Sequence, residues 1–204
     1  MYVIGLTGGI ACGKTTASST LQQLGACILD ADRLAHELAV PGGILYSAYV
    51  EHFGESILTQ NGTLDRKAVG ERVFCDPEER EWMDQLAQPI LFNEMKNRLE
   101  SCRMRGEHLV ILDVPLLLEA GWDVLCDEIW VIFVPRHVQR ERLMSRDHLT
   151  KQQADARMDS QMDPEEKCRR ADVVIDNSGG EDLMKEKIKA LYEERSSSVG
   201  VMFA

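Results

Sequence analysis

The chain has 204 residues, of which 44% are hydrophobic and 28% are charged, and its formal net charge is −11. This composition excludes an intrinsically disordered chain and a membrane-spanning one, and the negative charge argues against a nucleic-acid partner, because duplex binding relies on Lys and Arg. No basic leader or long apolar run opens the sequence, so we expect a cytoplasmic protein without membrane association. We expect one globular unit with insertions, as a monomer or weak homo-oligomer.

Cysteine and histidine spacing gives no sign of a disulfide framework or a metal site. The six cysteines are scattered without a CxxC pair, and none of the five histidines stands at zinc-ligand spacing. We therefore expect reduced thiols, several of them buried, and we assign no histidine to catalysis; solvated or helix-capping roles are expected for each.

The chain opens with two predicted strands, each of which leads into a helix. Residues 2–6 form an apolar run ended by glycines, which predicts a buried strand, and residues 14–24 carry helix-compatible side chains up to a glycine stop. Residues 27–30 predict a second short strand. Residues 33–38 predict a helix that ends near Pro41.

The middle of the chain, residues 44–105, has a helical pattern and no convincing strand. Breaks are expected at Gly54, at residues 61–62 and at residues 76–77, where Gly, Asn or Pro interrupts the pattern. A stretch of this length and character predicts a helical insertion.

Strand character returns three times, at residues 109–114, 128–134 and 173–176, each rich in β-branched residues. Helical segments separate these strands, residues 182–194 predict a closing helix, and residues 196–204 are typical of a frayed terminus. Because parallel strands need crossover connections, this alternation predicts an α/β fold. We expect five strands in one doubly wound parallel sheet, with helices on both faces and ligands at the carboxyl ends of the strands.

Directly after the first strand, residues 8–15 read GGIACGKT and fit the phosphate-binding pattern GxxxxGK[ST]. Glycines let consecutive backbone N–H groups turn toward phosphate oxygens, and the following helix adds its partial positive charge. Lys14 is expected to contact the β- and γ-phosphates of ATP, and the Thr15 hydroxyl to be a ligand of Mg²⁺. The alternative, an ordinary glycine turn before a helix, is disfavoured by the strand in front of it. The expected ATP-binding residues here are Gly9, Ala11, Cys12, Gly13, Lys14, Thr15 and Thr16.

This motif alone does not separate a kinase from a GTPase switch or an ATP-driven motor. A guanine-reading NKxD element is missing from the sequence, and residues 176–178, which come nearest, contain no lysine. A guanine switch is therefore disfavoured. Two alternatives stay open on the residues alone: a small-molecule kinase acting on a nucleoside, nucleotide or shikimate-like acceptor, and a nucleotide-dependent switch or binding protein.

Three aspartates follow predicted strands at the edge of the sheet where ligands are expected. Asp30 and Asp32 come where the second strand ends, and a carboxylate there could accept the proton of an acceptor hydroxyl. For Asp32, an N-cap of the following helix is an equally good interpretation of the spacing. Asp113 ends the third strand and is a candidate for holding a magnesium-bound water, or simply a cap.

Basic residues concentrate after the fourth strand. Residues 136–170 hold nine Lys or Arg against seven Asp or Glu, so this stretch is about +2 while the rest of the chain is about −13. Arg142 and Arg146 lie on one helix face, from which they could fold over a triphosphate and stabilise charge in the transition state. The alternative is a solvated helix with many ion pairs. Loops at residues 147–150 and 163–165 are expected to be the hinges of a lid.

Taken together, these segments resemble the dephospho-coenzyme A kinase family through nearly the whole chain up to the tail. The order and spacing of five blocks carry the resemblance, although each later block alone is weak. The blocks are LTGGIACGKTTA at residues 6–17, LDADRLAHEL at 29–38, LDRKAVGERVFCDP at 64–77, DVPLLLEAG at 113–121 and ADVVIDNSG at 171–179.

The resemblance implies the last step of coenzyme A synthesis, in which ATP phosphorylates the ribose 3′-hydroxyl of dephospho-coenzyme A. ATP as phosphoryl donor and Mg²⁺ are the implied cofactors, and ATP and dephospho-coenzyme A the implied partners. The implied organisation is a single P-loop kinase unit over residues 1–204, with a core of residues 1–38, 107–138 and 171–195, a helical acceptor-binding region at 44–105 and a lid at 139–170.

By the same resemblance, Asp32 would be the base that takes the 3′-hydroxyl proton, and Lys14 and Arg142 would be the other catalytic residues. Arg142 and Arg146 would bind ATP from the lid, and Asn177 would lie beside its adenine. The helical region would hold the pantetheine arm.

Three departures from the usual pattern of the family stand out. Where the family usually has Gly-Ser-Gly-Lys-Ser, this chain has ACGKT. Ala11 requires a backbone conformation that tolerates a Cβ, and Cys12 places a thiol next to the phosphates, where a thiolate of low pKa would make the enzyme sensitive to oxidation. Thr15 keeps the hydroxyl. Ala87 and Gln88 stand where many relatives have Asn-His.

Overall fold

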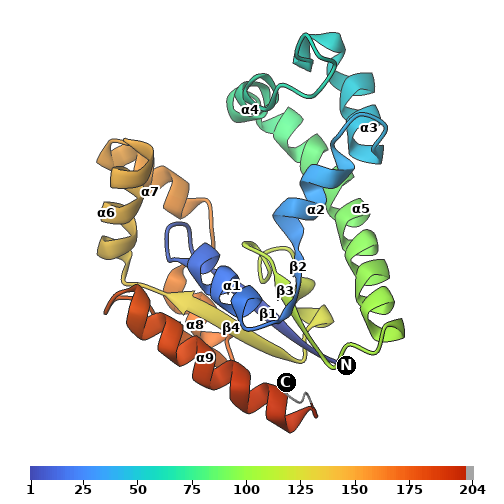
Figure 1. Ribbon diagram of the computed structural model, residues 1–204. Helices are drawn as coiled ribbons and strands as arrows, with labels where there is room; N and C mark the ends of the chain where they lie inside the picture. The colour runs from blue at the N-terminus through green and yellow to red at the C-terminus, as the bar shows by residue number, and fades with distance from the viewer. Residues whose placement is uncertain (201–204) are drawn as a thin grey trace. The chain divides into compact units, whose positions relative to one another are not determined.

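The computed structural model describes residues 1–200, except for the side chains of residues 74 and 75 (Figure 1). The chain divides into two compact units. We call Met1–Leu29 together with Arg98–Ala204 the core unit, and Asp30–Asn97 the helical unit. None of the helices within the described residues combines the length and the apolar character needed to cross a membrane.

The five predicted strands form one sheet: β1 (Tyr2–Gly8), β2 (Cys27–Asp30), β3 (Leu109–Asp113), β4 (Glu128–Phe133) and β5 (Val173–Asp176). Their order is β2-β3-β1-β4-β5, so that β1 lies in the middle. β1 pairs in parallel with β3 and with β4, and β4 pairs in parallel with β5. The predicted five-stranded parallel sheet is confirmed.

Helices cover both faces of the sheet, as predicted. α1 (Lys14–Gln23) and α9 (Glu181–Ser198) pack together over one face (Figure 1). Their side chains Leu21 and Ile188 are fully buried in the same cluster as Trp130 of β4. This cluster is the main core of the unit, and it fixes the start of α1 over the end of the central strand.

A close approach on the opposite face explains the glycine in the middle of β1. A Cβ at Gly5 would lie 2.7 Å from the Cys126 sulfur and 2.8 Å from a methyl group of Leu117, closer than real Cβ atoms come. The short 3₁₀ turn η2 (Trp122–Leu125) lies between Leu117 and Cys126 in the chain. Helix α8 (Pro164–Arg169) contacts β4.

Two further helices of the core unit, α6 (Arg136–Asp147) and α7 (Lys151–Asp159), lie against each other (Figure 1). Ion pairs join them: Arg136 with Asp159, and Arg140 with Asp155 at 2.5 Å. The two helices lie within the stretch in which a lid is expected.

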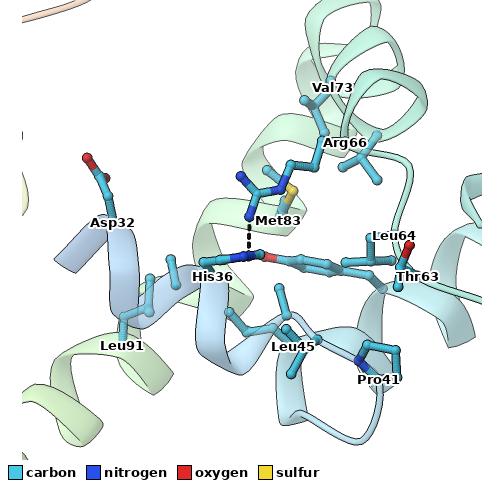
Figure 2. Close-up of a pocket in the computed structure, with 16 residues that line it drawn as sticks. Asp32, His36, Pro41, Leu45, Thr63, Leu64, Arg66, Val73, Met83 and Leu91 are labelled. Atoms are coloured by element: carbon cyan, nitrogen blue, oxygen red, sulfur yellow. Dashed lines mark hydrogen bonds between the residues drawn. The ribbon is translucent and has the colours of Figure 1, made fainter. Parts of the chain in front are cut away.

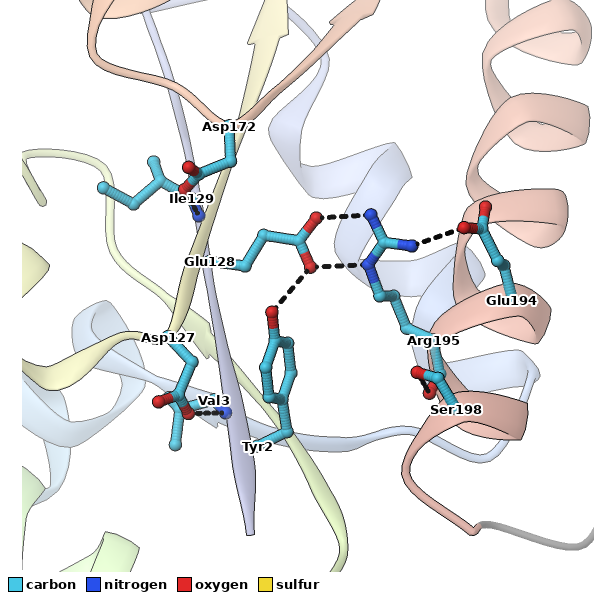
Figure 3. Close-up of polar contacts among 9 residues, drawn as sticks. All are labelled: Tyr2, Val3, Asp127, Glu128, Ile129, Asp172, Glu194, Arg195 and Ser198. Carbon is cyan, nitrogen blue, oxygen red and sulfur yellow. Dashed lines mark hydrogen bonds and ion pairs between the residues drawn. The ribbon is translucent and has the colours of Figure 1, made fainter.

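The closing helix is longer than the sequence predicts. α9 continues to Ser198, and the Ser196 side chain is fully buried, so the expected frayed terminus is wrong for residues 196–198. Figure 3 shows the reason: Arg195 donates to both carboxylate oxygens of Glu128, at 2.7 and 2.8 Å, and holds the last turns of α9 on β4. Of the rest of that prediction, residues 199–200 form a turn after α9, and residues 201–204 lie outside the described residues.

The helical unit contains α2 (Ala31–Leu38), α3 (Ile44–Phe53), the 3₁₀ turn η1 (Glu55–Ile57), α4 (Arg66–Cys75) and the first part of α5 (Pro77–Met104). The predicted breaks at Gly54 and at residues 61–62 lie outside the helices, and at residues 76–77 Asp76 separates α4 from α5, which begins at Pro77. All three predicted breaks are confirmed. Its own core is built around four buried side chains, Leu45, Tyr49, Phe53 and Ile57.

Candidate active site

The glycine-rich loop of residues 9–13 joins β1 to α1 at the end of the central strand. Two of its residues have a left-handed backbone: Gly13, with a φ of 99°, and Ala11, with a φ of 61°. No side chain among the described residues caps the first turn of α1. A helix N-terminus of this kind presents unsatisfied N–H groups and a partial positive charge, which favour an anion.

Asn177, directly after β5, supports this loop from one side. Its side chain is buried, and its Nδ2 donates to the carbonyl oxygen of Cys12 at 2.8 Å. A Cβ at Gly13 would lie 2.3 Å from the same nitrogen, so position 13 needs glycine for this contact as well as for its φ. The nearness of Asn177 to the adenine of ATP stays a prediction, while its side-chain contact is with the loop.

Lys14, the first residue of α1, forms an ion pair with Asp113 at the end of β3. The exposed fractions of the two side chains are 16% and 3%. The register of the sheet brings the two side chains together, because Asp113 lies opposite Leu6 of β1, and Leu6 lies just before the loop. Asp113 is therefore the counter-ion of Lys14, a partnership that spacing did not reveal across 99 positions of sequence.

Cys12 does not have the reactive thiol that its position suggests. Its side chain is 2% exposed, and burial raises the pKa of the thiol to about 11, although the nearby Lys14 acts in the opposite direction. Only the thiolate is an efficient nucleophile, so a buried neutral thiol is inert. The expectation of an oxidation-sensitive thiolate is therefore wrong, and Cys12 instead fills the main core of the unit.

Arg142 and Arg146 lie one turn apart on α6 but have different partners. Arg142 Nη2 donates to the carbonyl oxygen of Asn177 at 3.0 Å, which places it beside the residue that supports the loop. Arg146 donates to both carboxylate oxygens of Asp147, at 2.7 and 3.1 Å. Arg157 donates to the same carboxylate, and hydrogen bonding from Arg146 is the main cause that lowers the pKa of Asp147. The charge of Arg146 is thus compensated by a carboxylate, whereas Arg142 has a carbonyl partner.

Asp30, rather than Asp32, caps α2. The Asp30 carboxylate accepts hydrogen bonds from the backbone N–H groups of Asp32 and Arg33, at 2.8 and 3.0 Å. The N-cap interpretation of Asp32 is therefore wrong. Asp32 lies in the first turn of α2, where it is exposed and lines a pocket of the helical unit.

This pocket has a volume of about 680 Å³ and is shown in Figure 2. Its polar side chains include Asp32 and His36, on successive turns of α2, and Arg66 at the start of α4, which donates to Nδ1 of His36. A cavity of this size with a few converging polar groups is typical of a small-molecule site. The apolar side chains of its wall include Leu45, Tyr49, Leu64, Val69, Val73, Met83 and Leu91.

The described residues contain no cluster of three or more His, Cys, Asp or Glu side chains able to hold a metal ion. Mg²⁺ does not require such a cluster, because it keeps several water ligands and is bound through one or two protein oxygens together with substrate phosphates. Thr15 is exposed at the start of α1, and the Asp113 carboxylate ends the neighbouring strand. These two side chains are the oxygen donors of the core unit that suit the ion.

Comparison with known proteins decides among the kinases that this loop allows. The model of the dephospho-CoA kinase family matches residues 2–182. The chain belongs to this family. Relatives named dephospho-CoA kinase from Symbiobacterium thermophilum and Carboxydothermus hydrogenoformans are 40% and 41% identical to it, over 98% and 94% of this chain and 84% and 93% of their own length. A solved dephospho-CoA kinase from Campylobacter jejuni is 27% identical, with a TM-score of 0.74 over 96% of this chain and 98% of that one.

Within the family frame, the departures in sequence have local explanations. Ala11 keeps the left-handed φ that glycine adopts without strain, at a cost on the order of 1 kcal/mol. Ala87 lies inside α5, shortly before Pro89, and packs against the core of the helical unit. Ala87 therefore contributes an apolar contact to this core.

Sequence reasoning missed three residues beside the loop. Gln161 accepts a hydrogen bond from the backbone N–H of Ile10 at 2.8 Å. Lys167 is fully buried and forms an ion pair with Glu119 at 2.8 Å. Glu119 lies in one of the family blocks, but no periodicity distinguishes Lys167 from the exposed charges around it.

Proposed function

We propose that this protein transfers the γ-phosphoryl group of ATP to the ribose 3′-hydroxyl of dephospho-CoA, giving CoA and ADP. The observation that carries the proposal is the loop after the central strand, with Lys14 at the uncapped start of α1, in a chain of the dephospho-CoA kinase family. We further propose that the protein works in the cytoplasm on these two small molecules, as a monomer or weak homo-oligomer.

The donor would bind to the core unit. Backbone N–H groups of residue 11 and residues 13–16 would surround the phosphates, and Lys14 would contact the β- and γ-phosphates. Arg142 would stabilise the negative charge of the transition state, because its present partner is a carbonyl group that a phosphate oxygen can replace. Arg146 would have a weaker role, because Asp147 already compensates its charge.

The acceptor would bind to the helical unit. Asp32 would accept the proton of the 3′-hydroxyl as its oxygen attacks the γ-phosphorus and ADP leaves. The apolar wall of the pocket suits the pantetheine arm. His36, about one turn along α2 from Asp32, pairs with Arg66 of α4, and this pair suits the diphosphate next to the ribose.

Magnesium would be held by the Thr15 hydroxyl together with the phosphates, and Asp113 would orient one of its water ligands. When bound, the ion neutralises part of the charge that develops on the phosphates. The site residues of this protein then orient the donor, and Asp32 removes the proton.

The experiment that tests the proposal supplies purified protein with ATP, Mg²⁺ and a panel of acceptors. We expect dephospho-CoA to be converted to a product heavier by one phosphoryl group, with one ADP formed per product, as measured by mass spectrometry. Adenosine, AMP and shikimate serve as alternative acceptors. Phosphorylation of one of these in preference to dephospho-CoA, or ATP hydrolysis that no acceptor stimulates, would contradict the proposal.

A further inference from the structure

A short segment of the core unit, residues 161–167, is fastened beside the phosphate-binding loop by contacts that none of the assigned roles uses. Gln161 Oε1 accepts from the Ile10 N–H at 2.8 Å, and the Met162 N–H donates to Glu119 Oε1 at 3.0 Å. Lys167 Nζ donates to Glu119 at 3.0 Å and to the Pro115 carbonyl oxygen at 3.1 Å. We call residues 161–167 the anchor segment.

The buried charge of Lys167 makes this fastening specific. Its side chain is fully buried, so the ammonium group depends on oxygen atoms of Glu119 and Pro115 in place of water. A buried ion pair of this kind adds little net stability, but each partner strongly restricts where the other can lie. The Pro115 carbonyl also accepts from Thr7 of β1 at 2.9 Å, so the anchor segment and the strand that leads into the loop share one acceptor.

The loop needs such support because it contains a strained residue. Ala11 has a left-handed φ of 61°, a conformation that alanine holds only where its surroundings determine it. Gln161 fixes the backbone on one side of Ala11, at the Ile10 N–H, and Asn177 fixes it on the other, at the Cys12 carbonyl oxygen. Two carboxamide side chains from distant parts of the sequence therefore clamp the same three residues.

We propose that Gln161 is a positioning residue for the phosphate-binding loop, and that the ion pair between Lys167 and Glu119 holds Gln161 in place. The inference rests on the proposed function, since it requires nucleotide phosphates to bind this loop. A loop that is already fixed loses less conformational freedom when the phosphates bind, so the clamp raises nucleotide affinity.

The first test is the Gln161→Leu variant, which keeps most of the side-chain volume and removes the acceptor. One hydrogen bond contributes about 1 kcal/mol, so we expect the affinities for ATP and for ADP to fall about fivefold each in calorimetric titration. The KM for dephospho-CoA is expected to stay within about twofold, because one local contact of the core unit is changed.

Gln153→Leu is the matched control. Gln153 lies in α7, shortly before the anchor segment, and its side chain accepts from the Thr150 N–H at 2.9 Å in a capping box. The same substitution there weakens the helix cap without touching the loop. It is expected to lower the melting temperature while leaving the affinities for ATP and ADP unchanged. The control therefore separates a general loss of stability from the loss of the hydrogen bond to the loop.

The Lys167→Met variant tests the second half of the inference. If Lys167 acts through Gln161, Lys167→Met weakens nucleotide binding too, and the double variant binds no more weakly than the worse single variant. Gln161→Leu protein that binds ATP and ADP as tightly as the original, or a Gln153→Leu protein that loses the same affinity, would overturn the positioning role. Original protein that binds neither nucleotide would contradict the proposed function instead.

Discussion

Asp30 and Asp32, two aspartates where β2 ends and α2 begins, have different surroundings. The Asp30 carboxylate is engaged by two backbone N–H groups of α2, which satisfies the start of that helix. Asp32 lies in the first turn of α2, at the pocket with His36 and Arg66. A carboxylate at a pocket is well placed to accept a proton from a bound acceptor.

We predict that Asp32→Asn lowers turnover by about 10² to 10⁴, the usual contribution of a general base, and leaves ATP affinity unchanged. Steady-state kinetics and nucleotide titration measure the two quantities. Asp30→Ala is expected to lower stability by about 1 kcal/mol, because the helix cap is lost, and to leave turnover largely unchanged. An Asp32→Asn protein with near-normal turnover would remove this residue from the chemistry.

Arg142 and Arg146, one turn apart on α6, allow a second comparison. We predict that Arg142→Ala lowers kcat about 100-fold, the cost of removing one group that stabilises transition-state charge. Arg146→Ala is expected to cost less than about tenfold, because Asp147 already compensates its charge. Parallel kinetics of the two variants, on the same helix and with the same truncation, provide the check; equal losses would mean that the carboxylate does not screen Arg146.

The burial of Cys12 predicts an unreactive thiol, whereas its position beside the loop suggests a reactive one. With a thiol pKa of about 11, only about one molecule in a thousand carries the thiolate at pH 8. We expect iodoacetamide at pH 8 to leave Cys12 unmodified and activity intact in the folded protein, and to modify it after unfolding. Peptide mass mapping reads the outcome, and rapid loss of activity by labelling at Cys12 would show that the thiol is accessible.

At the scale of elements, one ion pair joins the last turns of α9 to β4, beyond the apolar cluster that packs the rest of the helix. Glu128 has a side chain that is 6% exposed, and Arg195 binds both of its oxygens. Burial alone would raise the pKa of Glu128, but hydrogen bonds from Arg195 and other groups lower it below its ordinary value of 4.5. The ionised pair therefore stabilises the fold above about pH 4.5, and that stability is lost as pH falls through the lowered pKa.

We predict that Arg195→Met lowers the free energy of unfolding by about 3 kcal/mol at pH 7, because Glu128 is left buried and charged. The difference from the original protein is expected to shrink as the pH falls below about 4.5, where Glu128 takes up a proton. Urea unfolding at pH 7 and pH 4 measures both values. Glu194→Gln, which removes the exposed partner of Arg195, serves as the control and is expected to cost less than about 1 kcal/mol.

Most elements could be predicted because their signals are local. Apolar β-branched runs predict the strands. Glycine and proline, here Gly54 and Pro77, interrupt a helical pattern in any chain. The end of α9 was missed because its serines carry no helical signal, and a contact 67 residues away holds that turn. The same limit applies to the site: the glycine motif identifies the loop, but the partners of Lys14 and Lys167 come from distant strands and loops.

For the whole molecule, the proposed donor site and the proposed acceptor site belong to different compact units. The loop residues belong to the core unit, and Asp32 with its pocket belongs to the helical unit. Each unit has its own buried cluster, so each can respond to a ligand locally.

We predict that the two substrates protect different amides from hydrogen exchange. ADP with Mg²⁺ is expected to protect peptides of the loop and α1, and dephospho-CoA to protect peptides of α2 and α4. At 100 times its dissociation constant, each ligand adds about 2.7 kcal/mol to the stability of the state that binds it. Exchange measured by mass spectrometry tests this, and protection of the loop peptides alone by dephospho-CoA would contradict the assignment of the acceptor pocket.

The central position of β1 also determines when a newly made chain can bind nucleotide. The helical unit is one continuous stretch, so its helices can pack as soon as they leave the ribosome. β1 is made before the other four strands but pairs with β3 and β4, which begin at Leu109 and Glu128, so it must wait until these strands are made. The phosphate-binding loop, although it precedes four of the five strands, is therefore among the last parts of the protein to take its working form.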